Sequence, residues 1–342
     1  MADLRSRAFQ ARLLLVLINL ASLGCLVWTL RDAHLSDFRD DLATIDYSWV
    51  AVAVAADVLV YLGYSLRWSV LLRPVVRTGF WRSARAIYMG LFANEVLPFR
   101  AGEVLRCYLL TRWTKLPFEV SLSSALIERI LDGIWLCLCL LLTLRFVEFP
   151  PQFHRLVDGA WILGLIVLAG ALLLAIASLV RSAGKREEVQ EPPPQKGWRR
   201  HLALLLDGVG SIGYSRYLLL ALLVSLPCLL LQAVPIWASF RGYGFDLSLT
   251  DAFALMVILR LISALPQAPG NIGLFQLLTK EVLIRIFNVV PDQAARFSVL
   301  LWGIVTLPLL IGGFIALWIE EADVLELKRQ AEEEAANLRS QG

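Results

Sequence analysis

The sequence predicts an all-α polytopic membrane protein with six full transmembrane helices and two oppositely oriented re-entrant hairpins. Three observations lead to this fold class. The 342-residue chain is 58% hydrophobic and only 18% charged, whereas about 25% of the residues are charged in typical soluble domains. Several apolar runs reach the roughly 20 residues that a helix needs to cross a bilayer. Two further apolar runs, 84–112 and 251–287, are interrupted by proline and glycine near their middle.

The uninterrupted apolar runs are interpreted as full spans, because each is long enough and is bounded by charged residues. They are 11–30, 49–72, 118–144, 157–180, 217–240 and 294–318. The first run is longer than the hydrophobic region of a signal peptide, so we expect it to remain as a transmembrane helix. Residues 1–320 therefore form a single transmembrane domain with a linker at 181–198, and 321–342 form a short cytoplasmic helical tail.

The two interrupted runs, called the first and second broken segments below, are interpreted as re-entrant hairpins. Each half holds too few apolar residues for a full span. Proline ends a helix, and glycine permits a tight backbone turn. The residues expected to set the hairpin backbone are Asn94, Pro98, Gly102, Pro266, Pro269, Gly270 and Gly273.

The broken segments also share a motif, which predicts an internal repeat. Leu97-Pro98-x-x-x-Gly102 recurs as Leu265-Pro266-x-x-x-Gly270. With both termini cytoplasmic, 19 Lys and Arg residues face the cytoplasm and 5 face the other side, as the positive-inside rule requires. In this topology the two hairpins enter the membrane from opposite sides. Similar units in opposite orientations form an inverted repeat, an arrangement common in transporters.

Charged side chains lie within the first broken segment and within the span at 118–144. Glu103 and Arg106 are three residues apart and share a helix face, as do Glu128 and Asp132, which are four apart. Arg129 can reach Asp132 at the next turn. A charge at the bilayer centre costs about 2.5–3.5 kcal/mol on insertion scales. We therefore expect these residues to face protein or water and to pair with the charges of the hairpin.

Two compatible interpretations of these charges remain open. In one, they form a purely structural ion-pair network that holds the hairpin to the span. In the other, they surround a polar cavity that binds a charged lipid head group. The residues expected to bind the head group are Arg100, Arg106 and Arg260, and the supporting network is Glu103, Glu128, Arg129 and Asp132.

Motifs of soluble enzymes are missing from the sequence. It holds no nucleotide-binding loop and no HExxH motif, and His34, His154 and His201 are scattered. We predict no catalytic site, no metal and no cofactor. The positive charge is spread over several loops, so nucleic acid is not an expected partner. Glu103 and Asp132 are capable of acid–base chemistry, which keeps a membrane enzyme open as an alternative.

The sequence resembles the lysylphosphatidylglycerol synthase transmembrane (flippase-like) family, also known as the UPF0104 membrane proteins. The resemblance covers nearly the whole chain. Its motifs are Asn94-x-x-x-Pro98-x-Arg100-x-Gly102-Glu103-x-x-Arg106, then Glu128-Arg129-x-x-Asp132, then Pro266-x-x-Pro269-Gly270-x-Ile272-Gly273. Gln276 departs from the pattern, since the family often has Glu there, so no charged role is expected at this position. We do not expect the soluble aminoacyl-transferase domain of the synthases in this chain.

The resemblance implies a lipid flippase or lipid-binding transporter of the bacterial inner membrane. The implied partner is a membrane lipid, either an anionic or zwitterionic phospholipid or a lipid-linked substrate. The alternative is a membrane enzyme, or the membrane subunit of one, that acts on an isoprenoid- or hopanoid-linked substrate beside a lipid-synthesis enzyme. A third hypothesis is a scaffold for a lipid-synthesis complex, in which charge-neutralising variants lose partner binding rather than transport.

Overall fold

The computed structural model describes residues 19–31, 36–97, 101–147, 208–213, 216–262 and 268–340, with a few residues between 151 and 169 and with side chains as far as 321. Within these residues the regular structure is helical and contains no strand, so the predicted all-α class is confirmed. A helix at Asn19–Leu30 comes first. It is followed by α2 (Phe38–Thr44), α3 (Tyr47–Leu72), α4 (Phe80–Val96), α5 (Gly102–Thr114), α6 (Phe118–Phe146), α9 (Arg216–Leu231), α10 (Ala233–Tyr243), α11 (Leu249–Ile262), the short 3-10 helix η3 (Pro269–Asn271), α12 (Leu274–Arg285) and α13 (Pro291–Ser340).

Among the described residues, three helical stretches are long and apolar enough to cross a membrane. They are Tyr47–Leu72, Arg216–Tyr243 and Pro291–Glu321, and they coincide with the predicted spans at 49–72, 217–240 and 294–318. The predicted span at 118–144 is the 29-residue helix α6, but the charges at its centre make it less apolar. The linker 181–198 and most of the predicted span 157–180 lie outside the described residues, so the count of six spans stays a prediction.

The predicted span at 217–240 is not one continuous helix. It divides at Gln232, between α9 and α10. Pro227 lies inside α9, and Pro235 lies in the first turn of α10. Neither can donate a backbone hydrogen bond, so the helical ladder is weakened on both sides of Gln232. The break lies inside a stretch, Arg216–Tyr243, that is still long and apolar enough to be the predicted span, and it leaves a polar side chain in the middle of that stretch.

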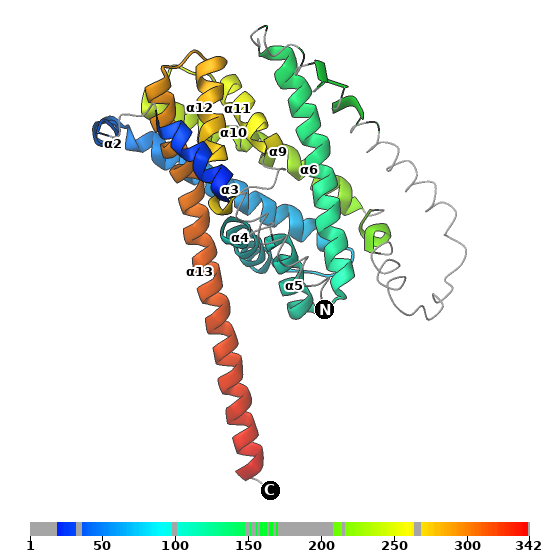
Figure 1. The fold of residues 1–342 in the computed structure, drawn as a ribbon. Helices are drawn as coiled ribbons and strands as arrows, with labels where there is room; N and C mark the ends of the chain where they lie inside the picture. The colour runs from blue at the N-terminus through cyan, green and yellow to red at the C-terminus, as the bar shows by residue number, and fades with distance from the viewer. Residues whose placement is uncertain are drawn as a thin grey trace, which may run out of the picture.

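Helix α13 is the element against which both broken segments pack (Figure 1). Near its beginning, Trp302 Nε1 donates to the carbonyl oxygen of Gly270 in the second broken segment, at 2.7 Å. Further along, Gly312 and Gly313 lie directly against the rings of Tyr88 and Phe92 on α4. The two broken segments thus contact α13 at successive positions in its first half, with α11 and α12 toward one end of the molecule and α4 and α5 further along α13.

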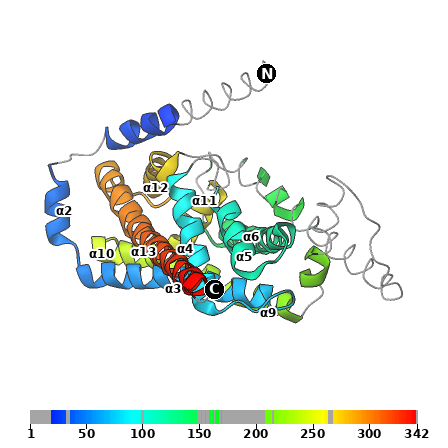
Figure 2. The same cartoon turned by 90° about the horizontal axis from the view of Figure 1, so that it is seen from below.

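The first described helix packs on α12, as the view from below shows (Figure 2). Lys280 Nζ donates to the backbone oxygen of Thr29 at 3.2 Å. At Gly273, an added Cβ would lie 1.9 Å from the backbone oxygen of Ser22. The positive φ of Gly273 (92°) and this close approach both require glycine there.

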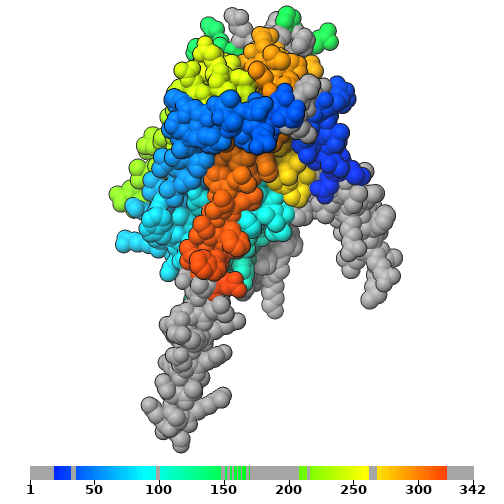
Figure 3. Space-filling model, turned by 90° about the vertical axis from the view of Figure 1, so that its left-hand side faces the viewer, coloured from blue at the N-terminus to red at the C-terminus, as the bar shows by residue number. Residues whose placement is uncertain are grey.

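On another face of the molecule, α2 and the start of α3 cross over α13 (Figure 3). Arg296 of α13 is bound there by the carboxylates of Asp41, at 2.5 Å, and of Asp292. The Asp46 carboxylate begins α3 by accepting a hydrogen bond from the Ser48 amide at 2.9 Å. Hydrogen bonds from Ser48 also hold the pKa of Asp46 below its usual range. Charge and capping thus fix the position of α3, which carries much of the site described below.

Gly102 starts α5 at the point where α5 crosses α4. Its amide donates to Asn94 Oδ1 at 2.9 Å, which satisfies one of the free donors at the start of a helix. A Cβ at Gly102 would lie 1.7 Å from the backbone oxygen of Gly90 and 2.7 Å from Asn94 Oδ1. Two of the residues predicted to set the hairpin, Asn94 and Gly102, therefore contact each other directly.

We expect Gly102→Ala to destabilise the protein by about 3 kcal/mol, because the obstructing atom belongs to the backbone of α4 and the two helices must separate to admit a methyl group. The matched control is Gly133→Ala in α6, where nothing lies within 4 Å of the added Cβ. There alanine is expected to be neutral or to stabilise the helix by up to about 1 kcal/mol. Thermal unfolding in detergent measures both changes. Equal melting temperatures for the two variants would contradict the close crossing of α4 and α5.

Candidate functional site

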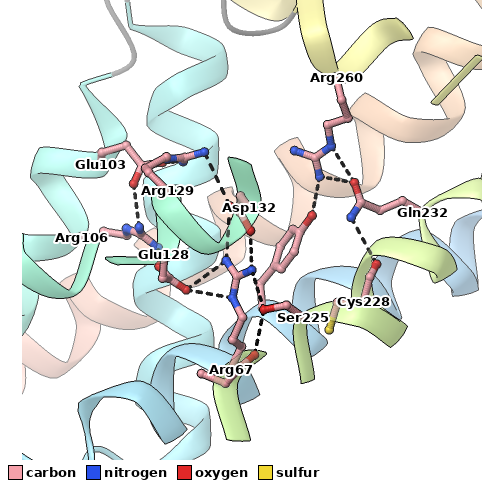
Figure 4. Close-up of polar contacts among 12 residues, drawn as sticks. Arg67, Glu103, Arg106, Glu128, Arg129, Asp132, Ser225, Cys228, Gln232 and Arg260 are labelled. Atoms are coloured by element: carbon pink, nitrogen blue, oxygen red, sulfur yellow. Dashed lines mark hydrogen bonds and ion pairs between the residues drawn. The ribbon is translucent and has the colours of Figure 1, made fainter. Parts of the chain in front are cut away.

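Six charged side chains from three helices form an ion-pair cluster, which is buried at Arg67, Arg106 and Glu128, partly exposed at Asp132 and exposed at Arg129 (Figure 4). The central residue is Glu128 of α6, which is only 1% exposed. Its carboxylate pairs with Arg106 of α5 at 2.6 Å and with Arg67 of α3 at 3.1 Å. The remaining members are Glu103, Arg129 and Asp132.

The cluster is electrically balanced, because three arginines face three carboxylates. Arg106 also pairs with Glu103 at 2.7 Å, and Arg67 pairs with Asp132. Arg129 completes the cluster by pairing with Glu103 and, at 3.9 Å, with Asp132. Buried charges are tolerated only when they are paired in this way. The predicted contact between the charges of the first broken segment and those of the span at 118–144 is therefore present.

Arg67 is the member of the cluster that was not predicted from the sequence. It lies near the end of α3, and its guanidinium contacts Glu128, Asp132 and, at 3.3 Å, the hydroxyl of Ser225 on α9. A signal was available in the sequence. Asp57, Tyr61, Tyr64 and Arg67 follow one another at helical spacing, which places a polar stripe on one face of an otherwise apolar span.

A second feature, a cavity of about 270 Å³, lies beside the ion-pair cluster and is called the central cavity below. Eight of the described elements border it: α3, α4, α6, α10, α11, η3, α12 and α13. Its lining contains both polar and apolar side chains, which are called the polar wall and the apolar wall below. The polar wall includes Asp57, Tyr61, Tyr64, Asn94, Glu95, Gln232, Arg260 and Asn271, and the apolar wall includes Leu91, Ile236, Met256, Leu259, Phe275, Leu278, Leu301, Val305 and Leu309.

The inner ends of the two broken segments meet at this cavity. Asn271 Nδ2 donates to the two carboxylate oxygens of Glu95, at 3.0 and 3.1 Å. Glu95 lies in the last turn of α4, and Asn271 ends η3. The left-handed backbone of Gly270 and Asn271 (φ 71° and 53°) turns the chain sharply here. Two segments 176 residues apart thus share one hydrogen-bonded contact.

Arg260 of α11 lies at the cavity wall and is held by neighbouring side chains. Its Nε donates to Gln232 Oε1 at 2.6 Å, and its Nη2 donates to the hydroxyl of Tyr64. Figure 4 shows the Gln232 amide facing Arg260, and Gln232 is the residue at which α9 and α10 are divided. The guanidinium is therefore held in one orientation before any ligand arrives.

The predicted site residues divide between the two features. Arg106, Glu103, Glu128 and Asp132 border a smaller cavity of about 60 Å³ inside the ion-pair cluster, whereas Arg129 and Arg260 border both cavities. Pro269 begins η3. Arg100, Pro98 and Pro266 lie outside the described residues.

Gln276, the position that departs from the family pattern, has a local role in the described structure. Its Oε1 accepts a hydrogen bond from the amide of Gly273 at 2.7 Å, which caps the start of α12. The uncharged side-chain amide of Gln276 thus provides the acceptor that the backbone N–H of Gly273 requires. Among the described residues no group of three or more His, Cys, Asp or Glu side chains is placed to hold a metal ion.

Comparison with known proteins agrees with the features above. Residues 10–313 match the family described as the lysylphosphatidylglycerol synthase TM region. The chain belongs to this family. It is similar to a UPF0104 membrane protein of Methanothermobacter thermautotrophicus, at 21% identity over 76% of this chain and 81% of the relative. It is also similar to the UPF0104 membrane protein MJ1595 of Methanocaldococcus jannaschii, at 22% identity over 81% and 86% of the two chains. This is therefore a membrane protein of that family. Since these relatives are archaeal, a bacterial inner membrane stays a prediction.

Proposed function

We propose that this protein binds a membrane lipid by its polar head group in the central cavity and carries the lipid between the two leaflets. The observation that carries the proposal is the meeting of both broken segments at one cavity, joined there by Glu95 and Asn271. Polar groups at bilayer depth are costly, and in membrane proteins they mark substrate and ion pathways. Discontinuous helices that meet near the midplane are the usual binding elements of transporters.

The two walls of the cavity suit the two parts of a lipid. Arg260 is held by Gln232 and Tyr64 through its Nε and Nη2, and its positive charge at the cavity wall attracts a phosphate. The apolar wall suits the first methylene groups of the acyl chains. A volume of about 270 Å³ is at the small end of ligand pockets, so the cavity accommodates the head group while the chains stay in the membrane.

The finer topology belongs to the same proposal. We place the two broken segments as re-entrant hairpins that enter from opposite sides of the membrane, with both termini cytoplasmic. Their shared motif and their common packing on α13, where they occupy successive positions, support this arrangement as a repeat. Movement of one hairpin against the other would open the cavity to each leaflet in turn, as in other inverted-repeat transporters.

Translocation in proteoliposomes tests the proposal. The purified protein is reconstituted with phospholipids that carry a fluorophore on an acyl chain, and the label in the outer leaflet is quenched chemically. We expect label from the inner leaflet to become accessible faster than in protein-free vesicles. Equal rates would contradict transport. Conversion of the lipid into a new species, detected by mass spectrometry, would instead favour a membrane enzyme.

A further inference from the structure

The polar wall of the central cavity contains one carboxylate oxygen that lacks a donor. Asp57 lies within α3, is 7% exposed and borders the cavity. Its Oδ2 has no hydrogen-bond partner among the described residues. Glu95, the other carboxylate of this wall, differs because Asn271 donates to both of its oxygens.

A buried acceptor without a donor is costly, and such groups are rare in folded proteins. The neighbouring side chains do not supply this donor. The Tyr61 hydroxyl, one turn away on α3, interacts with the Asp57 carboxylate and Arg260 attracts it electrostatically, yet Oδ2 has no hydrogen-bond partner among the described residues. Because the residue borders an open cavity, a group that enters the cavity can supply this donor.

We propose that Asp57 determines lipid specificity by accepting a hydrogen bond from an N–H or O–H group that the head group carries beyond its phosphate. The inference rests on the proposed function and assigns a substrate class to the same cavity. Ethanolamine offers N–H donors and glycerol offers O–H donors. The quaternary ammonium of choline offers neither, so it would leave Oδ2 unsatisfied and place methyl groups against a carboxylate.

The position of Asp57 relative to Arg260 suits a head group that has a phosphate at one end and an N–H or O–H donor at the other. Asp57 and Tyr64 are two helical turns apart on one face of α3, about 10 Å along its axis. Tyr64 holds Arg260 at one end of this face, and Asp57 occupies the other. A phosphate at Arg260 therefore leaves the terminal part of the head group directed toward Asp57.

Binding of matched lipids to the wild-type protein in nanodiscs tests the inference. Phosphatidylethanolamine and phosphatidylcholine, labelled on an acyl chain, differ only in the methyl groups on nitrogen and have the same net charge. We expect the ethanolamine lipid to bind about tenfold to a hundredfold more tightly, the range that an unsatisfied buried polar group implies. Phosphatidylglycerol forms a third arm. Tight binding of the glycerol lipid alone would identify O–H as the donor, and tight binding of the ethanolamine lipid alone would identify N–H. Either result supports the assigned role.

Asp57→Leu removes the acceptor at similar size. It is expected to lower the affinity for the donor-bearing lipid to that for phosphatidylcholine, which should itself not weaken. The control is Asp246→Leu, at a fully exposed side chain outside the cavity, which should preserve the preference. Equal binding of all three lipids by the wild-type protein would overturn the role of Asp57 while leaving lipid binding intact. Failure to bind any of them would overturn the proposed function as well. The wild-type comparison decides the question even if Asp57→Leu does not fold.

Discussion

Glu128→Ala is expected to lower the free energy of unfolding by about 3–5 kcal/mol, a large fraction of the stability of a typical domain. Glu128 is the carboxylate shared by Arg67 and Arg106, and both arginines are buried. Its removal leaves three cations facing two anions in a site from which water is largely excluded. Thermal unfolding in detergent, together with the yield of monodisperse protein, measures the effect.

The control for this change is Glu281→Ala, in an exposed pair with Arg285 one turn away. Such surface pairs contribute at most about 0.5 kcal/mol, so this variant should unfold as the wild type does. If Glu128→Ala unfolded at the same temperature as Glu281→Ala, the ion-pair cluster would not stabilise the fold.

A double variant, Arg106→Leu with Glu128→Leu, separates the structural interpretation of the cluster from the functional one. It removes one charge of each sign and leaves Arg67 with Asp132 and Arg129 with Glu103. Balanced replacement of buried ion pairs by apolar residues is often neutral, so its stability should exceed that of Glu128→Ala. A stable double variant that still moves lipid would show that Arg106 is structural. A stable variant that has lost transport would show that Arg106 takes part in binding.

The helical spans could be predicted because run length is a local property of the sequence. An apolar run of 20 or more residues has few alternatives to a membrane helix, and α3 and the spanning part of α13 begin and end close to the predicted residues. The break at Gln232 was missed for the same reason. Pro227 and Pro235 were visible, but a criterion based on hydropathy alone passes over proline within an apolar run.

The partner of a charged residue could be predicted only where both residues lie on the same helix, because their spacing then determines whether they share a face. Glu103 with Arg106 and Arg129 with Asp132 are of this kind. The contacts of Arg67 with Glu128, 61 residues away, and of Asn271 with Glu95 depend on which helices pack together. A motif can show that two segments are alike, as it did for the broken segments, but it does not show that their inner ends meet.

The structure also separates arginines that the sequence treated alike. Arg106 and Arg260 were both expected to bind a head group. Arg106 lies between Glu103 and Glu128 inside the ion-pair cluster, whereas Arg260 borders the central cavity. Burial and pairing, which only the folded chain reveals, therefore make Arg260 the stronger candidate for contact with a phosphate.

Arg260→Gln is accordingly expected to reduce translocation of a phosphate-bearing lipid by about a hundredfold, the loss that follows from removing one side of a buried charged pair. The substitution keeps a polar side chain beside Gln232 and Tyr64, so the melting temperature should change little. Arg260→Lys keeps the charge but loses the planar arrangement of donors, and it should recover only part of the rate. The measurement is the proteoliposome assay at several lipid concentrations, which distinguishes weaker binding from slower movement.

The control is Arg285→Gln, at an exposed arginine of α12 that does not border the central cavity. It removes the same charge and should translocate lipid at the wild-type rate. If Arg260→Gln also kept the wild-type rate, the phosphate would have to bind elsewhere, and Arg260 would serve only to hold α11 against Tyr64 and Gln232. A loss confined to Arg260→Gln would instead locate the negative charge of the substrate where α3, α10 and α11 meet, beside the joined ends of the two broken segments.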